Sequence, residues 1–307
     1  MRIAVTGGAG RLGVSVVNHL ASRGHDVHSL DRAASPLVDD AAQQHTLDLA
    51  DVGATKATLA GIRPHAVVHL AAIAVPFSAP EDLILRTNVQ LCYSVLSAAV
   101  DAGADRVLVA SSPTVLGYGT PQGWSPRYLP IDEEHPIAPW NAYALSKATL
   151  EATVRMFVAQ QGDAVRFGAF RPCFVISPDE WRGAPTQQGH TVAERLARPE
   201  LAAVSLFNYV DARDAAGFVE RWLEAAREVP NGEVFFVGAD DAMARRPLSE
   251  LVPQYFPGTE QMAAALTGTQ AAFTCAKALR LLGWRPQRSW RTELEGEPLA
   301  ATSVHLS

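Results

Sequence analysis

The chain has 307 residues, of which 48% are hydrophobic and 19% are charged, enough for one large or two modest domains with a sizeable core. The formal net charge of −6 and the isoelectric point near 5.8 argue against a nucleic-acid partner or an anionic membrane surface, because neither attracts a net negative protein. Cys92, Cys173 and Cys275 are widely separated and form no C-x-x-C pair, so we expect reduced thiols and no metal site. Met1 leads directly into a strand-like segment and no apolar run reaches membrane-spanning length, so we expect no signal peptide and a cytoplasmic protein.

The first element is a short buried strand at Arg2–Val5, which runs into a glycine-rich turn at Thr6–Gly13 and then an amphipathic helical pattern. The glycines have the spacing G-x-x-G-x-x-G. Gly7 permits the tight reversal, Gly10 lets the backbone approach a pyrophosphate, and Gly13 lets helix and strand pack closely. Amide groups at the start of the helix then bind the anion. Three spaced glycines also occur in ordinary strand–turn–helix units, so the prediction of a dinucleotide-binding turn depends on its context.

The second strand supplies that context. His25–Leu30 leads to Asp31, an acid at the strand end, where the Rossmann βαβ unit places a ribose-binding carboxylate. A carboxylate there accepts hydrogen bonds from ribose hydroxyls and repels a 2′-phosphate, so we predict NAD as the cofactor. The next residue, Arg32, could pair with such a phosphate, which leaves NADP possible.

Strands and helices alternate through the first half of the chain, as in a parallel, doubly wound sheet. We predict further strands at 44–47, 66–70, 106–110 and 164–170, and helices at 51–60, 80–102 and 141–161. Asp51 and Asn141 are the expected N-caps of two of these helices.

The second half of the chain is less regular. Residues 177–205 are rich in proline, glycine and polar side chains, as expected of a segment that covers a substrate. An amphipathic helix at 211–227 should return to the sheet, and a strand at 234–237 and two short helices follow. We therefore predict an α/β fold. Residues 1–176 form a doubly wound parallel Rossmann sheet to which 206–230 returns, and 177–205 and 231–307 form a small C-terminal substrate-binding lobe.

Tyr143 and Lys147 form the second informative pair. Their four-residue spacing puts both on one face of a helix. A free tyrosine has a pKa of about 10, and a phenolate base near neutral pH requires a lower value. A nearby ammonium, together with the positive nicotinamide ring, would lower the pKa. A tyrosine and a lysine four residues apart are also common by chance. Ser111 and Ser112 strengthen the functional interpretation, because they follow a strand at its carboxyl end, where open α/β sheets bind ligands and a hydroxyl can hydrogen-bond a substrate oxygen.

Together these features make the chain resemble the extended short-chain dehydrogenase/reductase family, which contains nucleotide-sugar epimerases and dehydratases. The resemblance covers about residues 1–215. Its motifs are Thr6–Gly13, His69–Ala72, Asn88-Val89, Ser111–Gly117, Tyr143–Lys147, Arg171-Pro172 and Tyr209–Asp211, and Lys277–Trp284 looks like the family's late helix.

The resemblance implies a role for each matching residue. Ser112 would polarise the substrate and Tyr143 would be the acid/base, while Lys147 would bind the nicotinamide ribose and lower the pKa of Tyr143. The implied cofactor-binding residues are Gly7, Gly10, Arg11, Leu12, Gly13, Asp31, Arg32, Asp48, Leu49, Leu70, Ala71, Ala72, Asn88, Ser111, Tyr143, Lys147 and Pro172. The expected substrate contacts are Ser112, Thr114, Tyr143, Cys173 and Arg182.

Some of these residues have simpler roles that are equally open. Asn88 could be a solvated helix residue. Cys173 is expected near the nicotinamide as a packing thiol. Arg182 stands next to Trp181 in a loop that should flank the cleft, where packing is the simpler role.

The chain also departs from the family pattern. Dehydratases carry an Asp-Glu pair where Pro113-Thr114 stands here, so dehydration is disfavoured. The segment 177–205 is short and offers no identifiable anchor for a nucleotide, which makes a smaller polyol, free sugar or uronate-like substrate plausible. We favour a dehydrogenase or reductase over an epimerase with retained cofactor. A non-catalytic NAD(P)-sensing protein is a further alternative, which the Tyr143/Lys147 pair disfavours.

The family commonly forms homodimers by pairing the two helices that correspond to 80–102 and 141–161, so a homodimer is expected here as well. Leu91, Val95, Ala98 and Ala99 could serve that interface or the face toward the sheet. The sequence does not separate the two.

Overall fold

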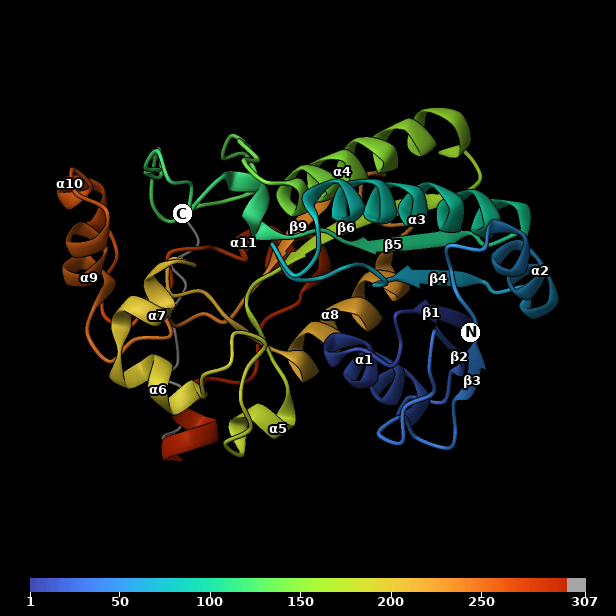
Figure 1. Cartoon of the computed structure of the whole chain (residues 1–307), viewed down its shortest axis with the longest axis horizontal. Coiled ribbons are helices and arrows are strands. Elements are labelled where there is room, and N and C mark those ends of the chain that lie inside the picture. Colours follow the sequence, from blue (N-terminus) through green and yellow to red (C-terminus); the bar gives the residue numbers. More distant parts are fainter. Residues whose placement is uncertain (297–307) are drawn as a thin grey trace.

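The computed structural model describes residues 1–296 and is built on a seven-stranded sheet in which every neighbouring pair of strands is parallel (Figure 1). The strand order is β3-β2-β1-β4-β5-β6-β9, so the winding reverses between β1 and β4. The strands are β1 (Arg2–Thr6), β2 (Asp26–Asp31), β3 (Gln43–Thr46), β4 (Ala66–His69), β5 (Arg106–Ala110), β6 (Arg166–Pro172) and β9 (Val234–Val237). The predicted doubly wound Rossmann sheet is confirmed.

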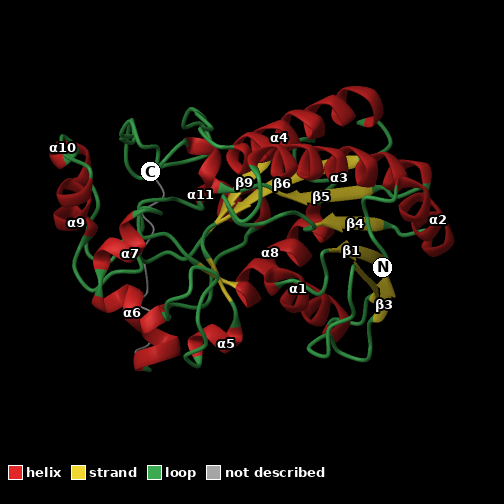
Figure 2. Cartoon of the chain, in the orientation of Figure 1, coloured by secondary structure: helices red, strands yellow, loops and turns green. Residues whose placement is uncertain are grey.

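Helices cover both faces of this sheet (Figure 2). One face carries α1 (Arg11–Ser22), α8 (Ala212–Ala225) and α11 (Ala276–Leu282), and the other carries α2 (Val52–Ile62), α3 (Glu81–Asp101) and α4 (Ala142–Gln161). Alternate strand residues serve the two cores: Val5 packs with α1 and α8, whereas Ala4 packs with α2 and α3. The helix expected at 211–227 therefore does return to the sheet, beside α1.

Side chains that cap the helices fix where the long elements begin. Asp51 accepts a hydrogen bond from the amide of Ala54, and Asn141 accepts one from the amide of Ala144. Both N-caps were predicted. Because Asn141 starts α4, it also sets the position of Tyr143 and Lys147 relative to the sheet.

Gly13 shows how closely the first helix approaches the first turn. A Cβ atom at this position would lie 2.0 Å from the carbonyl oxygen of Gly7 and 2.8 Å from the backbone of Gly8. No side chain larger than hydrogen fits there, as the glycine spacing predicts.

The smaller lobe has a core of its own, built from segments that the sequence separates widely. Its short elements are the 3₁₀ turn η1 (Pro113–Leu116), the two-stranded sheet β7 (Val175–Ile176) and β8 (Val210–Asp211), the helices α5 (Pro178–Trp181), α6 (Val192–Ala197), α7 (Pro199–Ala203), α9 (Leu248–Tyr255) and α10 (Glu260–Ala263), and the π-helical turn η2 (Arg291–Glu295). In Figure 1, α6, α7, α9 and α10 lie at the end of the molecule away from α2.

The predicted lobe boundaries need correction. The range 231–307 was assigned to the lobe, but β9 pairs with β6 in the main sheet and α11 packs on that sheet. Conversely Leu116, Leu129 and Ile131, assigned to the sheet domain, are buried in the lobe core. Residues 297–307 of the predicted lobe lie outside the described residues.

Helix α3 corrects a second expectation. The sequence was expected to contain no apolar run of membrane-spanning length, but α3 is long and apolar enough to cross a membrane. Half of its most apolar window is buried inside the fold. A buried core helix passes the same test.

The apolar residues Leu91, Val95, Ala98 and Ala99 of α3 all belong to the core against the sheet. They therefore serve the face toward the sheet and not the expected dimer interface.

Candidate active site

A cavity of about 740 Å³ lies at the carboxyl ends of the strands, where the winding of the sheet reverses. It brings together nearly all of the predicted site residues. Those that line it are Gly7, Gly10, Arg11, Leu12, Gly13, Asp31, Arg32, Asp48, Leu49, Leu70, Ala71, Ala72, Ser111, Ser112, Thr114, Tyr143, Lys147, Pro172 and Cys173. Asn88 and Arg182 are the two predicted residues outside the lining.

The glycine turn forms one end of the cavity and has the shape of an anion cradle. Gly7 has a positive φ of 73°, and a Cβ there would meet the amide nitrogen of Ala71 at 2.7 Å. Helix α1 starts from Gly10, which has no side chain to cap the first amides, and its first turn contains no acid. These amides are therefore free to bind a negatively charged group such as a dinucleotide pyrophosphate.

Asp31 lies at the rim of this end, held in place by two backbone amides. Its Oδ2 accepts from Ala9 N at 3.1 Å and its Oδ1 from Arg32 N at 2.7 Å. The carboxylate is thus fixed beside the turn, as a ribose-binding group requires.

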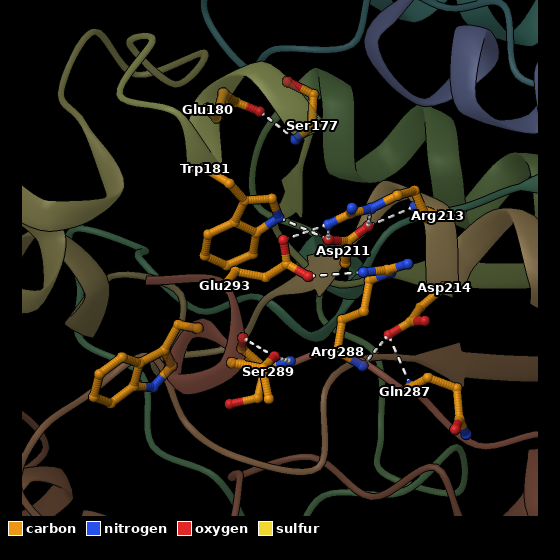
Figure 3. A network of polar contacts seen from close by, with 12 residues as sticks. Ser177, Glu180, Trp181, Asp211, Arg213, Asp214, Gln287, Arg288, Ser289 and Glu293 are labelled. Carbon is orange, nitrogen blue, oxygen red and sulfur yellow. Dashed lines mark hydrogen bonds and ion pairs between the residues drawn. The ribbon is translucent and has the colours of Figure 1, made fainter. Parts of the chain in front are cut away.

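Arg11, predicted to bind the cofactor, also links the turn to the lobe. It forms an ion pair with Glu180 of α5, a carboxylate that is only 2% exposed. Helix α5 is in turn anchored to the start of α8, because the indole of Trp181 donates to Asp211 Oδ2 at 2.7 Å (Figure 3). Arg213 pairs with the same carboxylate.

The predicted catalytic residues come from two neighbouring elements. Tyr143 and Lys147 lie on α4, with the lysine Nζ 5.8 Å from the centre of the tyrosine ring. Lys147 Nζ donates to the carbonyl oxygen of Ala110, the last residue of β5, at 2.7 Å. Ser112 is the second residue after β5, and its Oγ accepts from the hydroxyl of Thr114 at 2.9 Å. All five residues line the cavity.

Burial dominates the electrostatics of this group. It raises the pKa of Tyr143 to about 12, and a hydrogen bond with Ser112 opposes this only in part. It also lowers the pKa of Lys147 to about 8. The expected lowering of the Tyr143 pKa by Lys147 is therefore wrong for the protein on its own. Spacing along a helix shows that two groups are close, but it does not show how completely they are removed from water.

Ser111 has a different role from Ser112, although the two are adjacent. Its Oγ donates to Glu151 Oε1 at 2.6 Å, and Arg171 binds both oxygens of the same carboxylate at 2.8 and 2.9 Å. Arg171 and Glu151 are 4% and 3% exposed. Sequence reasoning missed Glu151, although it follows Lys147 at helical spacing. The hydroxyl of Ser111 is committed to this buried network, so Ser112 provides the hydroxyl that faces the cavity.

Asn88 supports the cavity from behind. Its Oδ1 accepts from Ile73 N at 2.8 Å, and its Nδ2 donates to Ile73 O at 3.2 Å and to Ser146 Oγ at 3.1 Å. It is 4% exposed, so the alternative of a solvated helix residue is wrong. Because Ile73 lines the cavity, Asn88 fixes the wall that follows β4.

Arg182 does not contact the cavity. Its side chain is 70% exposed and pairs with Asp179, so the structure gives no support to its predicted substrate contact. Trp181 packs and hydrogen-bonds inside the protein, in accord with the simpler role given to that loop. Cys173 lines the cavity, and burial raises its pKa well above the ordinary value, so it stays a protonated thiol.

Sequence reasoning missed the residues at the far end of the cavity. Tyr118, Phe174, Gln187, Gln188 and Asn208 line it there. They come from the loop after η1, the segment after β6, the segment between α5 and α6, and the segment before β8. Burial raises the pKa of Tyr118, and a hydrogen bond with Asn208 opposes that shift. These residues lie outside any regular spacing, so only the fold brings them together.

A model of the NAD dependent epimerase/dehydratase family matches residues 3–238. The chain belongs to this family. The resemblance to the extended short-chain dehydrogenases/reductases is confirmed. The matches to the first curated relatives span 62%, 51% and 46% of the length of those proteins.

The chain is 32% identical over 168 residues to the NAD-dependent glucose-6-phosphate dehydrogenase of Haloferax volcanii, a match that covers 50% of this chain and 62% of that protein. A solved UDP-galactose 4-epimerase has a TM-score of 0.67 at 26% identity, covering 95% of this chain and 96% of that one. A short-chain dehydrogenase/reductase superfamily protein from Agrobacterium tumefaciens, solved with bound NAD, has a TM-score of 0.70 at 23% identity over 96% and 95% of the two chains.

The role of Asn88 is testable with Asn88→Ala. This change removes all three hydrogen bonds of the carboxamide, so we expect the free energy of unfolding to fall by about 1–3 kcal/mol. Because the wall at Ile73 loses its support, the Kd for NAD should rise as well. Denaturant unfolding and calorimetric titration measure the two effects. Gln90→Ala, at an exposed site on the same helix, is the control. An unchanged Kd in Asn88→Ala would show that this wall does not depend on Asn88.

Proposed function

We propose that the protein is an NAD-dependent oxidoreductase that transfers hydride at a secondary alcohol or ketone of a sugar-like, polyhydroxylated small molecule. The observation that carries this proposal is the meeting of Ser112, Tyr143 and Lys147 in one cavity with the glycine turn and Asp31. This arrangement offers a hydroxyl to hold a substrate oxygen, a phenol to exchange its proton, and a cation beside them.

Each residue has a defined task in this reaction. NAD, if held at the glycine turn and Asp31, would supply the hydride acceptor for oxidation, and NADH the hydride donor for reduction. When a secondary alcohol is oxidised, its hydroxyl proton goes to Tyr143 Oη. In reduction Tyr143 returns that proton to the carbonyl oxygen. Ser112 Oγ holds the same oxygen. Since the pKa of Tyr143 is about 12 in the protein alone, the phenol is the proton donor at rest, and oxidation requires added positive charge near it.

Lys147 supplies part of that charge. With a pKa of about 8, it is mainly an ammonium at neutral pH. Its bond to the Ala110 carbonyl holds it at the end of β5, within reach of a ribose hydroxyl as well as of the phenol.

The lining favours a dehydrogenase or reductase over an epimerase. Turning a sugar over between two hydride transfers needs a firm remote anchor, normally the nucleotide diphosphate. Of the described residues that line the cavity, the basic ones are Arg11 at the glycine turn, Arg32 after β2 and Lys147 on α4. The far end offers Tyr118, carboxamides and an aromatic ring instead. The alternative of an epimerase with retained cofactor is supported by the similarity to a UDP-galactose 4-epimerase. The presence of both Tyr143 and Lys147 speaks against a non-catalytic NAD(P)-sensing protein.

The proposed cofactor preference is testable by titrating NAD and NADP separately. We expect tighter binding of NAD, because the fixed carboxylate of Asp31 binds ribose hydroxyls and repels a 2′-phosphate. Asp31→Asn should reduce the difference between the Kd values for NAD and NADP. Asp40→Asn, at an exposed site, should leave that difference unchanged. Tighter binding of NADP would show that Arg32 decides the preference.

We also propose a homodimer formed through α3 and α4. The outer faces of these helices expose Tyr93 (53%) and Leu145 (43%), large apolar side chains that a partner would cover. Light scattering at micromolar concentration should give twice the monomer mass, and Tyr93→Asp should lower it toward that of a monomer. A monomeric wild-type protein would refute this pairing.

The reaction itself is testable by mixing the protein with NAD and candidate sugars, uronates and polyols and following the absorbance of NADH. We expect NADH in proportion to the substrate consumed, and Tyr143→Phe should lower kcat by about 10²–10⁴-fold, the contribution typical of an acid/base. Tyr255→Phe, on the lobe helix α9, should keep full activity. Conversion of the substrate to its epimer without free NADH, with cofactor retained through gel filtration, would show that the protein is an epimerase.

A further inference from the structure

Arg195, on helix α6 of the lobe, is one of the most deeply buried side chains in the protein, at 1% exposure. Its Nη1 donates to Gln188 Oε1 at 2.7 Å and to His190 Nε2 at 3.0 Å, and its Nη2 to Ser205 Oγ at 3.3 Å. Its Nε has no hydrogen-bond partner within residues 1–296. Every group that it contacts is formally neutral.

The contrast with Arg171 shows what Arg195 lacks. Both guanidinium groups are buried, but Arg171 binds both oxygens of Glu151. In the described part of the chain, Arg195 has no carboxylate within ion-pair distance, and burial lowers its pKa to about 10, with no acid opposing the shift. It remains positively charged at neutral pH. A buried cation without a counter-charge is unfavourable, so such a group in a folded protein points to an anion from elsewhere.

Two of the neighbours of Arg195 connect it to the substrate end of the cavity. Its guanidinium carbon lies 4.1 Å from the centre of the Phe174 ring, and both Phe174 and Gln188 line the cavity. Arg195 holds the oxygen of the Gln188 carboxamide, so the amide –NH₂ of this exposed side chain is left to donate to a ligand.

The cavity has little negative charge of its own to balance this cation. Among the described residues that line it, the acids are Asp31 and Asp48, both next to the expected adenosine site. The positive charge of Arg195 therefore acts on the substrate end without an opposing carboxylate in the lining. Because Phe174 and Gln188 separate it from solvent, its field is only weakly screened there.

We propose that the substrate is anionic: it carries a carboxylate or phosphate group away from the reacting carbon, which accepts a hydrogen bond from Gln188 and is attracted by the buried charge of Arg195. This inference rests on the proposed function and names its substrate class. Gln188 is then a substrate-binding residue, and Arg195 is a positioning residue that acts through it.

The test compares matched sugars that differ in one group: neutral hexoses, the corresponding hexuronates and the corresponding hexose 6-phosphates, in both the gluco and galacto series. We expect an anionic member to exceed its neutral counterpart at least tenfold in kcat/KM, and the better of the two anions distinguishes carboxylate from phosphate. Arg195→Met should remove this preference mainly by raising KM for the anionic sugar, with kcat and the Kd for NAD nearly unchanged.

Arg198→Met is the matched control. Arg198 follows α6 directly, but its side chain is 62% exposed and pairs with the exposed Glu200. Arg198→Met removes one positive charge from the same segment but leaves Arg195 in place, so the preference for anionic sugars should remain. Gln188→Glu provides a second variant at an exposed site, in case Arg195→Met does not fold. Its carboxylate should pair with Arg195 and repel an anionic substrate, which also removes the preference.

A readout without turnover separates this inference from the proposed function. With NADH at saturation, the thermal unfolding midpoint of the wild type should rise with an anionic sugar and much less with its neutral counterpart, and Gln188→Glu should abolish the difference. If neutral sugars give an equal or higher kcat/KM, or an equal or larger rise in the unfolding midpoint, the proposal of an anionic substrate is wrong. The proposed oxidoreductase activity is not affected by that result. Anion-dependent stabilisation with no NADH formed from any sugar contradicts the proposed reaction instead.

Discussion

The buried ion pair between Arg171 and Glu151 holds helix α4 against the centre of the sheet. Arg171 comes from β6 and Glu151 from α4, and Ser111 at the end of β5 completes the network. Removing either charged partner would leave the other buried and uncompensated, so the three elements are bound to one arrangement. Tyr143 and Lys147 lie on the same helix, and their position relative to β5 follows from this anchor.

The two ends of the cavity are built in different ways. At the cofactor end the backbone forms most of the site. It provides glycines without side chains, unpaired helix amides, and two amides that fix a carboxylate. At the substrate end the lining consists of side chains from four irregular segments that pack around the core of the lobe. A backbone site suits a ligand shared by many enzymes, whereas a side-chain site allows the substrate to change while the sheet stays the same.

The same difference explains what could be predicted from the sequence. The turn at Gly7–Gly13, the acid at Asp31 and the pair on α4 depend on local spacing, and the structure brings them into one cavity as expected. Glu151 and Arg195 act through contacts between elements far apart in the chain, so no spacing marks their partners. Burial, which depends on the whole fold, raises the pKa of Tyr143 in the protein without cofactor, and the spacing along the helix gives no sign of it. The predicted lobe boundary was wrong for a related reason, because the sequence of the four-residue strand β9 does not indicate which sheet it joins.

The ion pair between Arg11 and Glu180 joins the glycine turn to helix α5, and its two partners differ in exposure, 40% for the arginine and 2% for the carboxylate. Glu180 also accepts from the amide of Ser177 at the start of α5, so the same carboxylate caps the helix and pairs with the turn. Removing Arg11 would leave this buried carboxylate without its counter-charge. A substitution at Arg11 should therefore disturb α5 as well as the glycine turn.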